Sequence, residues 1–156
     1  MGKLVIIMGS KADMDWSQKI ADAAVKLGME VAMRIASAHK VPLRCYEILK
    51  EYEKENPVFV TVAGRSNALS GFADAQTHCP VIACPPYGDK FAGNDIYSSF
   101  RMPSGVAPML ITEPDNAALA AAKIFGITNA NIRKKIIEFQ ESQRKKLIDD
   151  DTQLLK

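Results

Sequence analysis

Short runs of apolar, mostly β-branched residues alternate along the chain with longer stretches in which apolar residues recur every three or four positions. The first pattern is typical of strands buried on both faces of a sheet, and the second of helices that cover it. This alternation predicts an α/β fold, with a three-layer, doubly wound parallel sheet of the flavodoxin-like or Rossmann-like kind. Strands are expected at Lys3–Met8, Glu30–Ile35, Val58–Val62, Val81–Cys84 and Met109–Ile111.

The helix-length stretches carry residues that start or end helices. Gly28 follows the apolar positions of the first helix, where a glycine at the C′ position ends the last turn. Pro42 suits the first turn of the second helix, and the Asn56-Pro57 pair ends it. The other helices are expected at Ala68–Thr77, Ile96–Phe100, Asp115–Phe125 (ended by Gly126) and Asn131–Asp149, with a loop over Pro85–Gly93.

The apolar stripe of the last predicted helix fades along its length. Ile132 and Ile136 lie on one side of this helix, but Gln140 continues that side with a polar group. We therefore expect a single domain in which residues 1–126 form the α/β unit that carries the chemistry. Residues 127–156 are expected to form a C-terminal helical extension of this domain that leans on another subunit.

The composition is that of a globular protein, with 47% hydrophobic and 24% charged residues. A chain of 156 residues buries enough surface to fold without disulfides or a structural metal. Cys45, Cys79 and Cys84 are odd in number and match no metal-ligand spacing. Free thiols are typical of a reducing compartment, so a cytoplasmic protein is predicted.

The charge and apolar patterns argue against two classes of partner. The net charge is only +2, and basic residues near the carboxyl end are mixed with acidic ones, as on a solvated helix face. Because no basic stripe interleaved with aromatic residues is present, nucleic-acid binding is not expected. The N-terminal apolar run Leu4–Met8 is too short for a signal or membrane segment, so no membrane attachment is expected.

Ligands of open parallel sheets bind outside the carboxyl ends of the strands, so the segments that follow the strands are the candidate sites. The first, Gly9–Asp13, joins a strand to a helix through a glycine and a serine. Its backbone amides and hydroxyl suit a phosphate, but Ser10 or Asp13 would serve equally as an ordinary helix N-cap. Neither the dinucleotide nor the P-loop glycine pattern is present. The other segments are Ala36–Lys40, Ala63–Asn67 and Pro85–Gly88.

His39 lies in the second of these segments, and imidazole is the side chain best suited to proton transfer near neutral pH. Its small neighbours Ser37 and Ala38 leave room, and Lys40 suits a phosphate as a point charge. His39 is therefore a candidate acid–base group, with a structural histidine as the alternative. The other histidine, His78, precedes a strand and is expected at the opposite edge of the sheet, in a surface or capping role.

The third segment combines a guanidinium, a hydroxyl and an amide at positions 65–67, a set that suits a carboxylate or a polar heterocycle. It narrowly misses the G-x-S-x-G pattern of serine hydrolases because Ala68 replaces the second glycine. A hydrolase with Ser66 as nucleophile and His39 as base is an alternative, although no orienting acid is evident. A receiver-like module would need an aspartate where Ala63 stands.

Four motifs together resemble one family of enzymes. They are MGSKAD at Met8–Asp13, SAHK at Ser37–Lys40, AGRSNALSG at Ala63–Gly71 and YSSFRMPSG at Tyr97–Gly105. Over residues 3 to about 126, the chain is similar to the PurE family of purine biosynthesis. It resembles in particular the class II branch, the phosphoribosylaminoimidazole carboxylases.

The third motif distinguishes the two branches of this family. Class I members are mutases of N5-carboxyaminoimidazole ribonucleotide. They have a glycine- and alanine-rich loop ending in histidine after the third strand, and an arginine after the catalytic histidine. Here Arg65, Ser66 and Asn67 occupy that loop, and Lys40 follows His39. The resemblance therefore favours class II, with class I as the alternative.

The class II resemblance implies carboxylation of 5-aminoimidazole ribonucleotide by CO2 to 4-carboxy-5-aminoimidazole ribonucleotide, without metal, biotin, ATP or another cofactor. After the ring carbon attacks CO2, a base must remove a proton from that carbon, and we assign this step to His39. Ser10 and Asp13 are implied to hold phosphate and ribose, with Ser37 and Lys40 completing that site, while Gly64, Arg65, Ser66 and Asn67 are implied to line the side of the heterocycle and CO2. Many relatives have serine where Ala12 stands.

The resemblance also implies a closed homo-oligomer, a tetramer or octamer, with active sites near subunit boundaries. Three segments fit this expectation, because they offer more packing surface than one domain needs to close its own core. They are the small residues of Ala117–Ala122, the turn at Met102–Gly105 and the last helix, whose apolar stripe fades. The alternative is that the alanines only raise helix propensity and the tail is a solvated helix.

Overall fold

The computed structural model describes residues 2–88 and 93–155, in which strands and helices alternate in the predicted order. The strands are β1 (Lys3–Met8), β2 (Glu30–Ile35), β3 (Val58–Val62), β4 (Val81–Ala83) and β5 (Met109–Leu110). The α-helices are α1 (Met14–Lys26), α2 (Pro42–Glu53), α3 (Ala68–Gln76), α4 (Tyr97–Phe100), α5 (Pro114–Gly126) and α6 (Ala130–Leu154). Two 3-10 turns, η1 (Lys11–Asp13) and η2 (Asn94–Ile96), precede α1 and α4.

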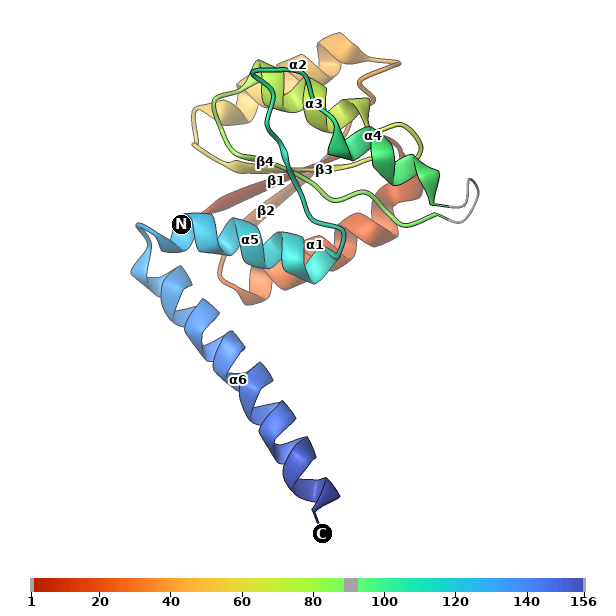
Figure 1. Cartoon of the computed structure of the whole chain (residues 1–156). Helices are drawn as coiled ribbons and strands as arrows, with labels where there is room; N and C mark the ends of the chain where they lie inside the picture. The colour runs from red at the N-terminus through yellow and green to blue at the C-terminus, as the bar shows by residue number, and fades with distance from the viewer. Residues whose placement is uncertain (1, 89–92, 156) are drawn as a thin grey trace.

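The five strands form one parallel sheet in the order β2-β1-β3-β4-β5. Helices α1 and α5 cover one face of this sheet, and α2 and α3 cover the other (Figure 1). This is the flavodoxin-like arrangement of doubly wound sheets, so the predicted fold class is confirmed. The direction in which the chain winds reverses between β1 and β3.

Each face of the sheet has its own apolar core, because successive side chains of a strand point to opposite faces. Leu4, Ile6 and Met8 of β1 pack in the core beneath α1 and α5. Val5 and Ile7 pack in the core beneath α2 and α3. All five are at most 1% exposed, so β1 is buried on both faces, as its continuous apolar run predicts.

The alanines of α5 belong to the first of these cores. Ala117, Ala118, Ala121 and Ala122 are fully buried, and α5 packs closely on α1. Their small size therefore brings two helices of the same chain together. The prediction that these alanines form a contact between subunits is wrong for the buried ones.

Two glycines near helix ends serve different purposes. Gly28 has φ +85°, and the amides of Gly28 and Met29 donate to the carbonyls of Val25 (2.9 Å) and Ala24 (3.1 Å). This confirms the predicted C′ position, in the double hydrogen bond of a Schellman motif. Gly126 instead remains within α5 and allows close packing, since a Cβ on Gly126 would lie 3.0 Å from Cδ1 of Ile136.

Other predicted boundaries shift by a few residues. The short helix predicted at Ile96–Phe100 is divided between η2 and α4. The last helix extends to Leu154, beyond the predicted Asp149, and an i,i+4 ion pair from Lys145 to Asp149 (2.7 Å) supports its distal half. The predicted loop Pro85–Gly93 includes residues 89–92, which lie outside the described residues.

Helix α6 begins inside the body and then leaves it. Ile132 and Ile136 are only 2% and 7% exposed and join the core beneath α1 and α5. Arg133 fastens this first part by donating to the carbonyls of Gly126 (3.1 Å) and Ile127 (3.2 Å). Every described residue after Gln140 is exposed, and the helix projects away from the sheet (Figure 1). The start of α6 is therefore packed on the body, and its remainder is exposed.

Glu53 at the end of α2 fastens this helix to the segment before β4. Its carboxylate accepts hydrogen bonds from Lys50 Nζ (2.8 Å), Thr77 Oγ1 (2.7 Å) and the His78 amide (3.4 Å). The bond from Lys50, followed by that from Thr77, lowers the pKa of Glu53 from 4.5 to about 2. The charged carboxylate therefore stabilises the fold at any pH above about 4.5, and this contribution is lost as the pH falls toward about 2.

We expect Glu53→Gln to lower the free energy of unfolding by about 1–2 kcal/mol at neutral pH, because charge-assisted hydrogen bonds are lost. The difference from the wild-type protein should shrink as the pH falls from 4.5 toward about 2, where Glu53 becomes protonated. Urea denaturation at a series of pH values measures this. Glu47→Gln, which removes an exposed carboxylate of the same helix, is the control. A difference that stays constant over this range would contradict the assignment.

Candidate active site

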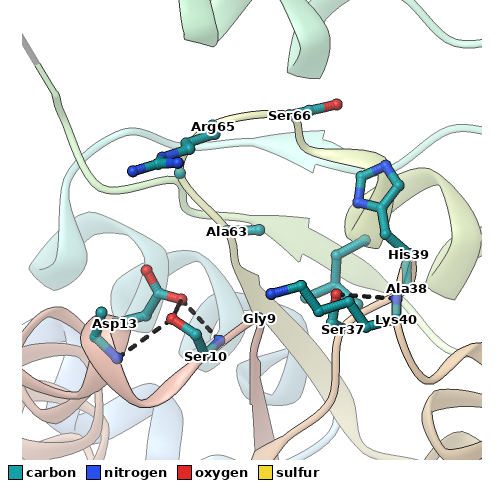
Figure 2. A pocket seen from close by; sticks show the side chains of 13 residues that line it. Gly9, Ser10, Asp13, Ser37, Ala38, His39, Lys40, Ala63, Arg65 and Ser66 are labelled. Carbon is teal, nitrogen blue, oxygen red and sulfur yellow. Dashed lines mark hydrogen bonds between the residues drawn. The ribbon is translucent and has the colours of Figure 1, made fainter. Parts of the chain in front are cut away.

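A cavity of about 400 Å³ lies at the carboxyl edge of the sheet, between the loops that follow β1, β2 and β3 (Figure 2). It sits at the reversal point between β1 and β3, the usual ligand position in this topology. The lining residues are Gly9, Ser10, Ala12 and Asp13 of the first loop, Ser37, Ala38, His39 and Lys40 of the second, Ala63, Gly64, Arg65 and Ser66 of the third, and Leu69 of α3.

Backbone hydrogen bonds continue past the ends of the strands and hold the three loops in register. The Gly9 amide donates to the Val62 carbonyl (2.8 Å), and the Ala36 amide donates to the Met8 carbonyl (2.9 Å). Each loop therefore starts from a fixed position beside its neighbour. Side chains far apart in the sequence meet in the cavity for this reason.

In the first loop, Ser10 and Asp13 form a reciprocal cap. Asp13 Oδ2 accepts from the Ser10 amide (3.0 Å) and from Ser10 Oγ (3.2 Å), and Ser10 Oγ accepts from the Ala12 amide (3.2 Å). This capping box begins η1. The two interpretations of this loop are therefore compatible, because the same residues cap a turn and line the cavity.

The second loop presents His39 and Lys40 at the mouth of the cavity, where both are exposed. Ser37 Oγ accepts from the Lys40 amide (3.3 Å), which closes the turn that carries His39. Figure 2 shows the Lys40 side chain extending toward the loop of Ser10 and Asp13, with His39 beside it. A cation thus faces the first loop, whereas the His39 imidazole points toward Ser66 of the third loop (Figure 2).

The third loop contributes Gly64, Arg65 and Ser66 but not the side chain of Asn67. Asn67 is only 2% exposed and does not line the cavity. Its Oδ1 accepts from the Ser70 amide (3.2 Å), which caps α3, and its Nδ2 donates to Ser99 Oγ (2.8 Å). Every other residue predicted for the site lines the cavity.

The serine hydrolase alternative finds no support in the cavity. Within residues 2–88 and 93–155, no hydrogen bond joins Ser66 to His39 or His39 to a carboxylate, so no triad is assembled. His78 lies before β4 at the opposite edge of the sheet, as predicted. It is exposed there, with Nδ1 3.3 Å from Glu53 Oε1.

The cysteines are free, buried and absent from the cavity lining. Burial raises the pKa of Cys45 and of Cys84 to about 11, and it also raises the pKa of Cys79. These thiols are therefore not nucleophiles at neutral pH.

Neither a metal-binding cluster nor a membrane-spanning helix is present in the part of the chain that the structure describes. No cluster of three or more His, Cys, Asp or Glu side chains in them is placed to hold a metal ion. None of the helices formed by these residues is long and apolar enough to cross a membrane.

The fourth segment after a strand, Pro85–Gly88, does not reach the cavity. It lines a neighbouring hollow of about 290 Å³, and among the described residues Gly64 alone lines both this hollow and the cavity. Three residues near the cavity carry no role in the sequence prediction. Leu69 lies within the third motif and adds apolar lining, whereas Ser98 and Ser99 lie in the fourth motif and contact Asn67.

Comparison with known proteins agrees with this geometry. A profile of the family described as AIR carboxylase matches residues 3–146. The chain belongs to the AIR carboxylase family. This finding confirms the family that the four loop motifs predict, and it makes the protein an enzyme.

Individual relatives align over nearly the whole chain. The phosphoribosylaminoimidazole carboxylase of Archaeoglobus fulgidus is 61% identical over 152 residues, covering 97% of this chain and 84% of that protein. The protein of the same name from Treponema denticola is 49% identical over 153 residues, covering 97% and 96%. The crystal structure of Treponema denticola PurE superposes with a TM-score of 0.97 at 47% identity, and the match covers 100% of both chains.

Two substitutions of Asp13 test its capping role separately from its charge. Asp13→Asn keeps an acceptor for the Ser10 amide, so the free energy of unfolding should stay within about 0.5 kcal/mol of the wild-type value. Asp13→Ala removes the acceptor and should lower it by about 1 kcal/mol. Chemical denaturation of the two variants measures the difference. If both variants are equally stable, the reciprocal cap contributes nothing.

Proposed function

We propose that this protein carboxylates 5-aminoimidazole ribonucleotide with CO2 to give 4-carboxy-5-aminoimidazole ribonucleotide. The observation that carries the proposal is the meeting of Ser10, Asp13, Lys40 and His39 in one cavity, in a chain of the AIR carboxylase family. The two similar proteins named phosphoribosylaminoimidazole carboxylase support it. A volume of about 400 Å³ also suits a mononucleotide.

In this proposal the phosphate binds between the first loop and Lys40. The Lys40 ammonium supplies a positive charge, and Ser10 Oγ supplies a hydroxyl. Asp13 uses Oδ2 for the cap, which leaves Oδ1 to accept from a ribose hydroxyl. The ring of the substrate then lies toward Gly64, Arg65 and Ser66, the remaining wall of the cavity.

The reaction takes place in two steps on the bound ring. The amino-substituted imidazole behaves as an enamine, and its ring carbon forms a bond to the carbon of CO2 while one C=O π pair moves to oxygen. The product of this step carries a carboxylate and an extra proton on a tetrahedral ring carbon. His39 accepts that proton, the C–H electron pair returns to the ring, and aromaticity is restored.

The nascent carboxylate needs hydrogen-bond donors. The Arg65 guanidinium and the Ser66 hydroxyl are on the proposed ring side of the cavity and are suited to this role. No cofactor is required, because CO2 is itself an electrophile and the substrate supplies the electron pair. The third loop, with Arg65 and Ser66, favours this reaction over the class I mutase reaction. The presence of Lys40 after His39 favours it as well.

We also propose a homo-oligomer, a tetramer or octamer, that works in the cytoplasm. Large apolar side chains are exposed on elements next to the cavity, Leu43 of α2 (78%) and Phe100 of α4 (61%). Leu147 and Ile148 are exposed on the projecting part of α6. Apolar surface of this extent supports contact between subunits. The free cysteines support a reducing compartment.

The choice between the two branches is tested with purified protein, aminoimidazole ribonucleotide and bicarbonate, without ATP. Product should form at a rate that rises with dissolved CO2, and N5-carboxyaminoimidazole ribonucleotide should be a poor substrate. Efficient conversion of the N5-carboxylated compound without dependence on CO2 would establish the class I reaction instead. Turnover of neither compound would overturn the proposed function altogether.

His39→Asn should lower kcat by about 10²–10⁴, the usual contribution of a positioned acid–base group. The KM for aminoimidazole ribonucleotide and the unfolding temperature should change little, because His39 is exposed and only the proton acceptor is lost. His78→Asn is the matched control, since it removes the other histidine at the far edge of the sheet. Full activity in a folded His39→Asn protein would remove His39 from the mechanism.

The assembly is tested by light scattering on the whole chain and on a chain without residues 141–156. This deletion spares Ile132 and Ile136, which belong to the core. The whole chain should have the mass of a tetramer or octamer. The shortened chain should lose both mass and activity on dilution. A fully active monomer would show that the exposed surfaces serve no assembly.

A further inference from the structure

The fourth motif, Tyr97–Gly105, contributes no residue to the cavity lining, although it is one of the four that identify the family. Its first part forms the one-turn helix α4, and the rest continues as an irregular segment over α3. Its contacts with the third loop show what it does.

Asn67, the residue after Ser66, is held by hydrogen bonds from both its backbone and its side chain. Its amide donates to Ser98 Oγ (2.9 Å), and Nδ2 donates to Ser99 Oγ (2.8 Å). Its Oδ1 accepts from the Ser70 amide (3.2 Å), and its carbonyl accepts from Ser70 Oγ (3.4 Å). One residue thus joins the third loop to α3 and to α4 at once.

The part of this network that joins Asn67 to Ser99 and Ser70 is shielded from water. Asn67 is 2% exposed and Ser99 is 5% exposed, so water does not readily replace the bond between their side chains. Ser98 is itself fixed, because its Oγ donates to the Asp95 carbonyl (2.8 Å). Ser99 is therefore an anchor shielded from solvent, whereas Ser98 is exposed and is held by its own bond to Asp95.

The segment that follows α4 is fastened to α3 independently. The Ala107 amide donates to Asp74 Oδ2 (2.7 Å). Met102 packs so closely on α3 that a Cβ on Gly71 would lie 2.9 Å from its Sδ. These contacts keep α4 in place beside Asn67.

Arg65 and Ser66 lie between two fixed points. On one side, β3 ends at Val62, whose carbonyl accepts from the Gly9 amide (2.8 Å). On the other side stands Asn67. The side chains of Arg65 and Ser66 are themselves exposed, so their position depends on the backbone that carries them.

We propose that Asn67, Ser98 and Ser99 are positioning residues that hold the Arg65-Ser66 backbone at the cavity. The proposal rests on the carboxylation reaction proposed above. It assigns the fourth motif the role of supporting the third loop, without contact with the substrate. Because the phosphate end of the substrate binds at the first loop and Lys40, loosening the third loop affects the reacting end of the substrate and spares its binding.

Ser99→Ala removes the acceptor of Asn67 Nδ2 and is small enough to keep the fold. We expect kcat to fall by about tenfold to a hundredfold, the scale of a displaced catalytic contact, while KM for aminoimidazole ribonucleotide changes by less than about threefold. Ser104→Ala, an exposed serine of the same motif, is the matched control and should retain both constants. An unchanged kcat in Ser99→Ala overturns the proposal. So does a uniform loss of kcat/KM that follows the loss of folded protein.

Amide hydrogen exchange gives a readout that does not depend on activity. In Ser99→Ala, and in Ser98→Ala, which removes the acceptor of the Asn67 amide, exchange at that amide should accelerate at least about tenfold relative to β1. Unchanged exchange in both variants overturns the proposal. If the wild-type protein fails to carboxylate aminoimidazole ribonucleotide, the proposed function is wrong, and the exchange rates still decide whether Ser98 and Ser99 hold Asn67 in place.

Discussion

β1 pairs in parallel with β2 on one side and β3 on the other, and the whole site depends on this double pairing. In the two ladders Met8 is opposite both Ile35 and Val62, so the three strands end at one level. The three loops of the cavity therefore start side by side, although their first residues, Gly9, Ala36 and Ala63, lie 27 positions apart in the sequence. A slip of one residue in either ladder would turn every side chain of the slipped strand to the other face and displace one wall of the cavity.

The elements that depend on local sequence could be predicted. β1 is an unbroken apolar run because it is buried on both faces, and Pro42 and Gly28 mark helix ends by their backbone geometry. Since the strands are parallel, the segments that follow them lie at the same edge of the sheet. The sequence therefore predicts that His39, Lys40 and Ser10 lie close together. The short helix α4 was predicted one residue too long, and the 3-10 turns η1 and η2 were not predicted, because a single turn carries too little periodicity to be recognised.

The features that depend on distant contacts could not be predicted. The side-chain amide of Asn67 could bind a ligand or cap a helix. Its hydrogen bond to Ser99, 32 positions later in the chain, is what keeps it in the protein interior. Likewise, alanines suit a subunit contact and a tight helix pair equally well, and only the packing of α5 on α1 decides between them. In both cases the residue type allows several partners, and the tertiary structure selects one.

In the homo-oligomer proposed above, the division of α6 into a buried start and an exposed remainder would make its helical content depend on assembly. Residues 141–155 are all exposed, and a helix of this length without tertiary contacts is only marginally stable in water. In a dissociated subunit, residues 141–155 unfold from the carboxyl end of the helix. A neighbouring subunit that covers Leu147 and Ile148 stabilises them as helix. The far-ultraviolet circular dichroism per residue will then grow with protein concentration until subunits are fully associated, so a spectroscopic titration of helicity yields the association constant directly.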